Sequence, residues 1–202
     1  MADLECVRGD RRLFAGLSFR VEPGSLLHVH GPNGSGKTTL LRAVSGLVLQ
    51  EAGRILWKGE EIRRAGEDYH RELLYHGHAV GLKLELSGYQ NLRIFGRLGG
   101  FGVTEAKVES AMKRLGLARC VDLPVKVLSQ GQKKRVSLAR LLLQPASLWV
   151  LDEPFTALDV AAVGLLQSLI QDHVAGGGMV IMTTHQEVDI PAQRIQHIHL
   201  DS

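Results

Sequence analysis

Apolar and polar positions follow a period of two in several parts of this 202-residue chain. Over residues 1–25 the alternation is interrupted by turn residues at 9–10 and 23–24, which predicts antiparallel strands. Another strand of this kind is predicted over residues 53–62. Shorter, more continuously apolar runs predict buried core strands at 26–30, 148–152 and 179–182.

Other segments repeat their apolar residues at helical spacing. One such run predicts a helix directly after the first buried strand, and it consists of Leu40, Leu41, Val44 and Leu47. A helical pattern extends from about 82 to 128, and its clearest apolar stripe consists of Val108, Ala111, Met112 and Leu115. Thr104 can cap that helix and Gly116 can end it. The glycines at 96, 99, 100 and 102 predict a flexible connection, and another helix is predicted at 163–174.

These patterns predict an α/β fold made of one domain over residues 1–202. Its core is expected at about 1–80 and 140–202, with a helical insertion at about 81–139. A hydrophobic share of 45% with 22% charged residues is typical of a globular protein of this class. The net charge of +3, from 24 basic and 21 acidic residues, is too weak to indicate a nucleic-acid partner.

Membrane and redox signals are weak in the sequence. No apolar run approaches the roughly 18–20 residues that cross a bilayer. Asp3 and Glu5 interrupt the N-terminal region where a secretory signal would need an apolar stretch. Cys6 and Cys120 lie far apart and fit no metal or redox spacing. We therefore expect a soluble protein in a reducing, cytoplasmic setting.

A glycine-rich segment after the first buried strand matches the phosphate-binding pattern G-x-x-x-x-G-K-[ST] at every position. It consists of Gly31, Pro32, Asn33, Gly34, Ser35, Gly36, Lys37 and Thr38, with Thr39 following. The glycines let successive N–H groups point into one anion nest, Lys37 can reach the β- and γ-phosphates of ATP, and the Thr38 hydroxyl can join a Mg²⁺ shell. The alternative, a glycine-rich surface turn, does not account for the strand before it and the helix after it.

Two carboxylates follow the apolar run at 148–151. Asp152 stands where a parallel strand ends, which is where ligands bind in open α/β sheets, and its oxygens suit Mg²⁺ directly or through water. Glu153 can polarise a water for attack on the γ-phosphate. The alternative is a strand followed by an acidic turn, and the phosphate loop earlier in the chain makes this alternative weaker.

A third motif, Leu-Ser-Gln-Gly-Gln, occupies residues 128–132. Ser129 and Gln132 have the spacing of a capping box, so a helix is expected to begin there. Gly131 allows close approach to that helix N-terminus, which can bind an anion. The alternative is a well-capped helix without a ligand.

The order of these motifs, ending with Thr183, Thr184 and His185, resembles the ATP-binding subunits of ABC transporters. The resemblance implies a P-loop NTPase with a RecA-like parallel core, an N-terminal antiparallel β subdomain and the inserted helical subdomain. It implies Glu153 and His185 as catalytic residues, His185 contacting the γ-phosphate. It also implies that a second copy, arranged head to tail, supplies its signature to the bound ATP, and that Asp159 communicates across this dimer. The signature residues are Ser129, Gly131 and Gln132, and Gln130 replaces a glycine that is usual in the family.

Residues 77–83, 148–159 and 183–186 further resemble the cytochrome c maturation ATPases of the CcmA family. This resemblance implies haem export powered by ATP, separate integral membrane subunits as partners, and a peripheral location on the cytoplasmic side of the inner membrane.

The chain departs from the ABC pattern at two positions. Ala79 occupies the place of a glutamine that senses Mg²⁺ and couples to the membrane subunit, and the adenine-stacking aromatic is undefined, with Phe14 as a candidate. Ala79 leaves open a membrane-associated adaptor that binds ATP with weak turnover, and export of another small molecule is a second alternative. A nucleotide kinase shares the phosphate loop but has no role for the signature or the Asp-Glu strand.

Overall fold

The computed structural model describes residues 1–186, 189–192 and 194–200, which form two compact units. The first unit comprises Met1–Gly77, Ala146–Pro154 and Ile170–Ser202, and the second comprises His78–Pro145 and Phe155–Leu169.

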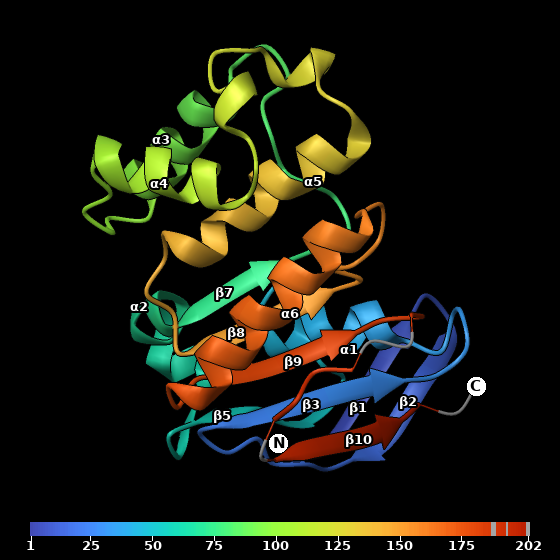
Figure 1. Ribbon diagram of the computed structural model, residues 1–202. Coiled ribbons are helices and arrows are strands. Elements are labelled where there is room, and N and C mark those ends of the chain that lie inside the picture. Colours follow the sequence, from blue (N-terminus) through green and yellow to red (C-terminus); the bar gives the residue numbers. More distant parts are fainter. Residues whose placement is uncertain (187–188, 193, 201–202) are drawn as a thin grey trace. The chain divides into compact units, whose positions relative to one another are not determined.

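A five-stranded sheet, parallel throughout, forms the centre of the first unit, in the order β10-β3-β9-β8-β7 (Figure 1). The strands are β3 (Ser25–His30), β7 (Leu73–His76), β8 (Leu148–Asp152), β9 (Met179–Thr183) and β10 (Ile195–His199). All residues of β8 and β9 are buried, which explains their continuous apolar sequence. The three predicted core strands are confirmed, whereas β7 and β10 were not predicted.

A second, antiparallel sheet has the order β2-β1-β4. Its strands are β1 (Ala2–Arg8), β2 (Arg11–Leu17) and β4 (Ala52–Arg54), and a turn at residues 9–10 joins the first two as expected. The prediction of one strand over 53–62 is wrong, because β4 is followed by β5 (Leu56–Trp57) and β6 (Glu60–Glu61). Lys58 and Gly59 separate this last pair with φ angles of 51° and 90°, the left-handed conformation of a tight hairpin turn.

The core of the first unit lies against one face of the parallel sheet, where α1 (Lys37–Val44) and α2 (Ile62–Glu72) contribute side chains. Leu27 of β3 and Leu40 of α1 are both fully buried there. Tyr69 of α2 is buried, and its hydroxyl donates a hydrogen bond of 2.6 Å to the carbonyl oxygen of Val44. Leu47 was expected on the helix stripe but lies beyond the end of α1 and is 54% exposed.

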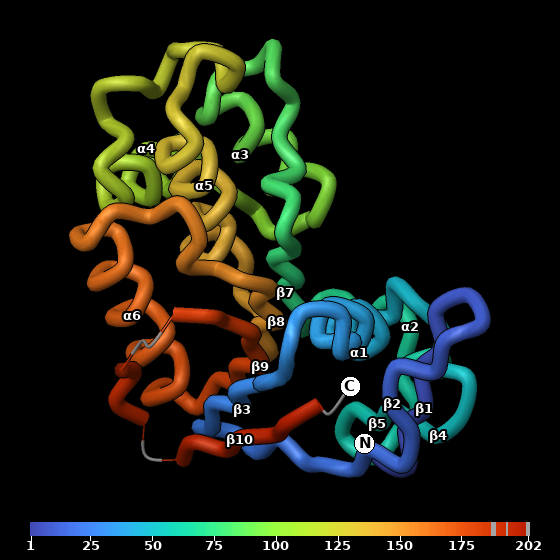
Figure 2. The backbone as a smooth tube through the Cα atoms, turned by 90° about the vertical axis from the view of Figure 1, so that its right-hand side faces the viewer, coloured from blue at the N-terminus to red at the C-terminus, as the bar shows by residue number. Residues whose placement is uncertain are grey.

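The second unit is helical, and α3, α4 and α5 lie side by side in it (Figure 2). Its elements are α3 (Gly88–Leu98), α4 (Glu105–Arg114), η1 (Ala118–Cys120), η2 (Val125–Val127), α5 (Gln130–Leu138), η3 (Ala139–Leu142) and the start of α6 (Val160–Ala175). The predicted stripe of α4 is buried and Thr104 caps this helix, accepting from the Lys107 N–H at 3.3 Å. Gly96 was expected in a connection but belongs to α3, where a Cβ would lie 2.6 Å from Val103. The helix α6 begins at Val160, three residues before its predicted start.

Candidate functional site

The phosphate loop connects the end of β3 to the start of α1 in the first unit. Gly31 has a φ of 145°, and a Cβ at this position would lie 2.6 Å from both the Leu200 carbonyl oxygen and Ser35 Oγ. Gly36 caps α1 with a φ of 102°, and a Cβ there would lie 3.1 Å from the ring of Phe14. Glycine is therefore required at both positions by conformation and by space. Phe14 lies against the loop, where its role in binding adenine stays a prediction.

Lys37 lies across this loop and is only 9% exposed. Its Nζ donates to the carbonyl oxygens of Gly31, at 2.7 Å, and Pro32, at 3.0 Å. An ammonium group has three N–H donors, so one remains for a phosphate oxygen. The Ser35 hydroxyl is buried and has no hydrogen-bond partner among the described residues. A buried cation beside a buried hydroxyl without a partner fits a bound polyphosphate.

Asp152 ends β8 and is held by hydroxyl groups from two other elements. Thr38 Oγ1, at the start of α1, donates to Asp152 Oδ2 at 2.9 Å, and Thr183 Oγ1, at the end of β9, donates to Asp152 Oδ1 at 2.8 Å. Hydroxyl and carboxylate oxygens are the ligands that Mg²⁺ prefers, so the pair Thr38 and Asp152 fits this ion chemically. The contribution of Thr183 was not among the predicted site residues, although it begins the Thr-Thr-His run that was noted.

Glu153, directly after Asp152, has an unusual backbone. Its φ of 49° lies in the left-handed region, which is uncommon for a residue with a side chain, and its N–H donates to Thr183 Oγ1 at 3.1 Å. The Glu153 carboxylate accepts from the His185 backbone N–H at 3.3 Å, and its other oxygen lies 3.4 Å from His185 Nε2. The structure therefore brings Glu153 and His185 together at the carboxyl end of the parallel strands, and their catalytic roles stay predictions. This arrangement places a carboxylate beside an imidazole, a pair chemically suited to proton transfer.

The signature motif lies in the second unit at the start of α5. The predicted capping box is present, because Ser129 Oγ accepts from the Gln132 N–H at 3.2 Å and Gln132 Oε1 accepts from the Ser129 N–H at 2.8 Å. A Cβ on Gly131 would lie 3.1 Å from the carbonyl oxygen of Ala157. The signature therefore lies next to the loop that carries the predicted dimer-communication residue. That residue, Asp159, accepts a hydrogen bond of 2.8 Å from the Ala162 N–H near the start of α6.

The segment after Ala79 is attached to the signature helix within the second unit. Ala79 is exposed, and Ser137 Oγ of α5 donates to the Val80 carbonyl oxygen at 2.8 Å. Arg140 donates to the Gly81 carbonyl oxygen at 2.6 Å. The side chain of Asn91, on α3, accepts from the Lys83 N–H at 2.7 Å and donates to the Ser87 carbonyl oxygen at 2.9 Å. These contacts, which the sequence patterns did not indicate, fix the segment that follows Ala79.

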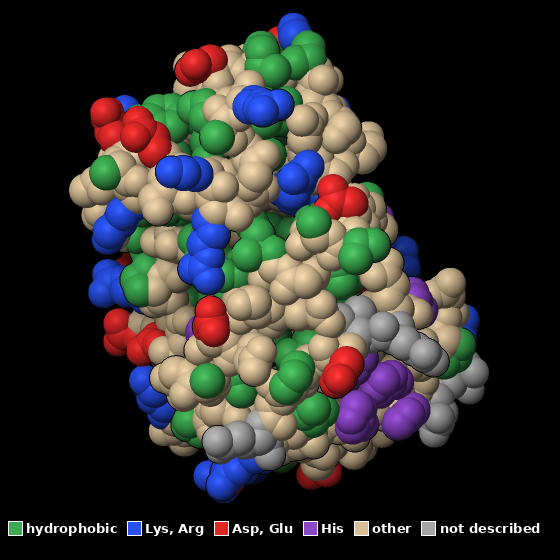
Figure 3. Space-filling model, in the orientation of Figure 1, with side chains coloured by type: hydrophobic (Ala, Val, Ile, Leu, Met, Phe, Trp, Pro, Cys, Tyr) green, Lys and Arg blue, Asp and Glu red, His purple; other side chains and the backbone are tan. Residues whose placement is uncertain are grey.

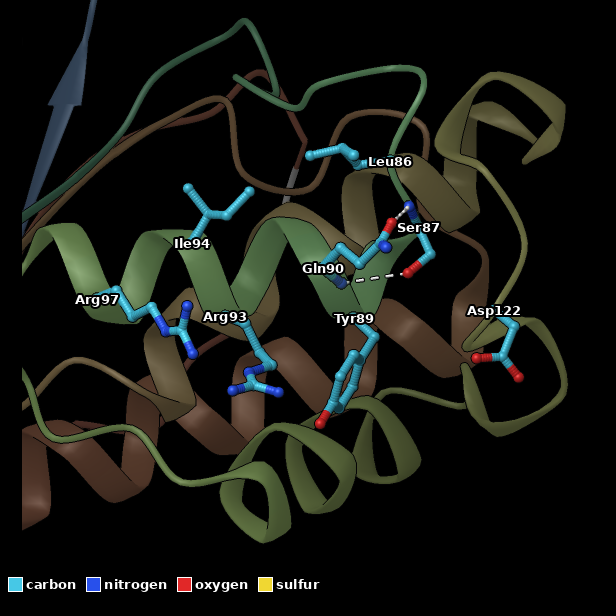
Figure 4. A pocket seen from close by; sticks show the side chains of 8 residues that line it. All are labelled: Leu86, Ser87, Tyr89, Gln90, Arg93, Ile94, Arg97 and Asp122. Carbon is cyan, nitrogen blue, oxygen red and sulfur yellow. Dashed lines mark hydrogen bonds between the residues drawn. The ribbon is translucent and has the colours of Figure 1, made fainter.

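A groove of about 530 Å³ lies beside this segment, along α3 (Figure 4). It is lined by Leu86, Ser87, Tyr89, Gln90, Arg93, Ile94, Arg97 and Asp122. Two hydrogen bonds between Ser87 and Gln90 form a second capping box at its rim. Ile94 is 41% exposed, so the groove offers apolar surface beside its arginines.

Comparison with known proteins identifies the family. The ABC transporter family matches residues 14–156. A cytochrome c biogenesis ATP-binding export protein CcmA of Nitrosospira multiformis is 51% identical over 98% of this chain and 96% of the relative. A CcmA of Pseudomonas aeruginosa is 53% identical over 92% of both chains. The chain belongs to the CcmA family of ABC transporter ATPases. The predicted family and its ATPase activity are thereby confirmed.

Solved structures agree with this fold. A putative ABC transporter ATP-binding protein from Pyrococcus furiosus superposes with a TM-score of 0.84 at 25% identity, covering 98% of this chain and 95% of the other. A dimeric ATP-binding cassette bound to ADP and phosphate superposes with a TM-score of 0.85 at 21% identity, covering 98% of this chain and 92% of the other. The predicted P-loop NTPase fold is confirmed. Among the described residues, no helix combines the length and apolarity needed to cross a bilayer.

Proposed function

We propose that this CcmA-family ATPase binds MgATP at residues 31–39 and hydrolyses it with Glu153 as the general base, thereby driving cytochrome c maturation. The observation that carries this proposal is the pairing of the Glu153 carboxylate with His185, beside the Asp152 site. The close CcmA relatives are named for cytochrome c biogenesis and export, which supports the biological role.

The residues divide the chemistry among them. The loop N–H groups and Lys37 would orient the β- and γ-phosphates. Thr38 and Asp152 would hold Mg²⁺, which would neutralise phosphate charge. Glu153 takes a proton from water as the water oxygen attacks the γ-phosphorus. The bond between that phosphorus and the bridging oxygen then breaks and ADP leaves. His185 donates its N–H toward the γ-phosphate oxygens.

Two copies of the chain are proposed to close head to tail over two ATP molecules. Each copy would offer the N-terminal end of its α5 helix, with Ser129, Gly131 and Gln132, to the phosphates that the other holds. Ser129 is exposed, and one structural neighbour is a dimer bound to ADP and phosphate, both of which support this arrangement. In this dimer Asp159, next to the signature, would communicate between the copies.

The partners proposed to use the free energy of ATP hydrolysis are separate integral membrane subunits that supply haem for attachment outside the cytoplasm. The chain would then be peripheral, on the cytoplasmic side of the inner membrane. The segment after Ala79 and the groove along α3 are the docking surface proposed for these subunits. Ile94→Asp is expected to abolish co-purification with them while leaving the ATPase rate of the isolated chain unchanged. Leu98→Asp is the matched control, since Leu98 is 84% exposed on the same helix outside the groove.

The central experiment is Glu153→Gln, which keeps size and hydrogen bonding but removes the base. ATP is expected to bind while turnover falls by about a hundredfold or more. Glu51→Gln, an exposed glutamate of the same unit, is the control and should behave as the parent. Unchanged turnover in Glu153→Gln would exclude Glu153 as the base. In cells, Glu153→Gln should abolish holo-cytochrome c while the apoproteins persist, and normal holo-cytochrome c would favour another export substrate.

A second candidate function, an ATP-binding adaptor with weak turnover, is favoured by Ala79 alone. Ala79→Gln should raise ATPase activity mainly in the presence of membrane subunits if the missing amide weakens coupling. An equal rise in the isolated chain would instead indicate a local effect on Mg²⁺.

A further inference from the structure

Four histidines form a two-by-two array on one face of the parallel sheet. Each of two strands carries a His-x-His pair, His28 and His30 on β3 and His197 and His199 on β10. Because successive residues of a strand point to opposite faces, both members of each pair share a face. On β3 the intervening Val29 is fully buried in the core on the other face.

The strand register places these pairs next to each other. β3 and β10 are parallel neighbours, with His28 opposite His197 and His30 opposite His199. The histidine side chains form one patch on the surface (Figure 3). His30 Nε2 and His197 Nδ1 are hydrogen-bonded at 2.8 Å, and the His28 and His30 ring centroids are 4.1 Å apart.

Three of these residues bring nitrogen atoms to a common point. One ring nitrogen from each of His28, His30 and His197 lies within 4.8 Å of the other two. His28 Nε2 is buried without a hydrogen-bond partner among the described residues, which is costly unless a ligand satisfies it.

We propose that His28, His30 and His197 bind one divalent transition-metal ion of the type of Zn²⁺. Tetrahedral zinc with Zn–N distances of about 2.0–2.1 Å holds its nitrogen ligands about 3.3–3.4 Å apart. The His30–His197 pair, at 2.8 Å, must therefore open by about half an ångström, and a pair at the 4.8 Å limit would have to close by about 1.4 Å. His197 is exposed and His30 is half-buried, so rotations about their side-chain torsions are the movements that would bring these nitrogens to a common ion. Water completes the coordination, and His199 packs on His30 with ring centroids 4.9 Å apart.

The site would connect an edge strand to the strand that leads into the phosphate loop. His30 is the residue before Gly31, and its carbonyl oxygen accepts the Leu200 N–H at 2.9 Å. β10 lies at the edge of the sheet and pairs with β3 alone among the described strands. A metal ion joining His197 to His28 and His30 would therefore hold β10 against β3, and would raise the stability of the first unit by an amount that grows with the logarithm of the free zinc concentration above the Kd.

The test is zinc titration of the full chain by calorimetry, without nucleotide or Mg²⁺, together with thermal unfolding. The parent is expected to bind one Zn²⁺ per chain and to melt at a higher temperature when zinc is present. His197→Gln, an exposed change on the edge strand, should weaken zinc affinity at least about tenfold and remove this shift. His28→Gln should have the same two effects. If the His28→Gln protein does not fold, the zinc affinity of His197→Gln alone tests the proposal.

His70→Gln is the matched control, because His70 is an exposed histidine on α2 outside the array. It should bind zinc as the parent does. Equal zinc affinity in the parent and His197→Gln would overturn the proposal, and would place any bound zinc elsewhere, for example on Asp152. An equal loss in His70→Gln would show that the binding is non-specific surface chelation and would also overturn it.

Discussion

Replacing Thr183 with valine isolates the contact that positions both carboxylates of the site. The substitution exchanges a hydroxyl for a methyl group, so the packing volume is kept. It removes the donor to Asp152 Oδ1, at 2.8 Å, and the acceptor for the Glu153 N–H, at 3.1 Å. Thr183 is fully buried and Asp152 is 2% exposed, so water cannot easily replace the lost partner.

The expected cost follows from these two hydrogen bonds. A buried hydrogen bond to a charged group contributes about 1.5–3 kcal/mol and a backbone N–H without a partner costs about 1 kcal/mol more, so Thr183→Val should lower the free energy of unfolding by about 3 kcal/mol. For a chain of this size that corresponds to a drop of roughly 6–12 °C in melting temperature. Because Glu153 would lose its backbone anchor, kcat should fall by about tenfold to a hundredfold, with less change in KM for ATP.

Thermal unfolding and steady-state ATPase kinetics measure the two effects. Thr183→Ser is the decisive comparison, since it keeps the hydroxyl and loses only a methyl group. It should recover most of kcat, even if loss of the methyl contacts still lowers the melting temperature slightly. A Thr183→Val protein with parental kcat, or a Thr183→Ser protein as slow as the valine variant, would refute the view that this hydroxyl positions Glu153.

Three further predictions concern other parts of the molecule. Lys37→Met should weaken ATP binding by about tenfold or more in calorimetry, because it removes the cation facing the phosphates; parental affinity would contradict the loop assignment. Ser129→Ala should lower the free energy of unfolding by about 1 kcal/mol in urea, through loss of the capping box, whereas no change would show that the cap is redundant. Burial lowers the pKa of His173, which stacks on Trp149 with ring centroids 3.9 Å apart. As the pH falls, His173 is therefore protonated in the unfolded chain before it is protonated in the folded chain. The free energy of unfolding should thus fall as the pH drops below about 6.5. His173→Phe should reduce this pH dependence, and an identical pH profile would contradict the assignment.

Local sequence patterns predicted most of the elements that hold the site. The apolar runs located β3, β8 and β9, and capping chemistry located the starts of α4 and α5, because each depends on neighbouring residues alone. The segment at 53–62 shows where this fails. Its alternation continues through Lys58 and Gly59, yet the left-handed backbone there reverses the chain. Only the Lys-Gly pair itself could have indicated that turn.

The contacts that complete the site depend on residues far apart in the chain, so the sequence patterns could not show them. Thr38 and Asp152 are 114 positions apart, and both were predicted only because each belongs to its own motif. Asn91 belongs to no such pattern, and the Thr-Thr-His run did not indicate what the Thr183 hydroxyl contacts, so both roles follow from which strand or helix lies beside them. The histidine array was equally hidden, because two His-x-His pairs acquire a common face only when β10 pairs in register with β3.

The geometry around Asp152 assigns different tasks to its two hydroxyl partners. Thr38 bonds to one carboxylate oxygen from the phosphate loop side, and this same pair of oxygens is the one suited to Mg²⁺. Coordination would use a lone pair of the Thr38 oxygen, so its O–H can keep donating to Asp152 when the ion is bound. Thr183 bonds to the other oxygen and at the same time receives the Glu153 N–H, so its contacts can persist with or without nucleotide. Thr183 thus connects Asp152, the proposed metal ligand, to Glu153, the proposed base, through hydrogen bonds that form without nucleotide, so loss of Thr183 should be measurable in the nucleotide-free chain.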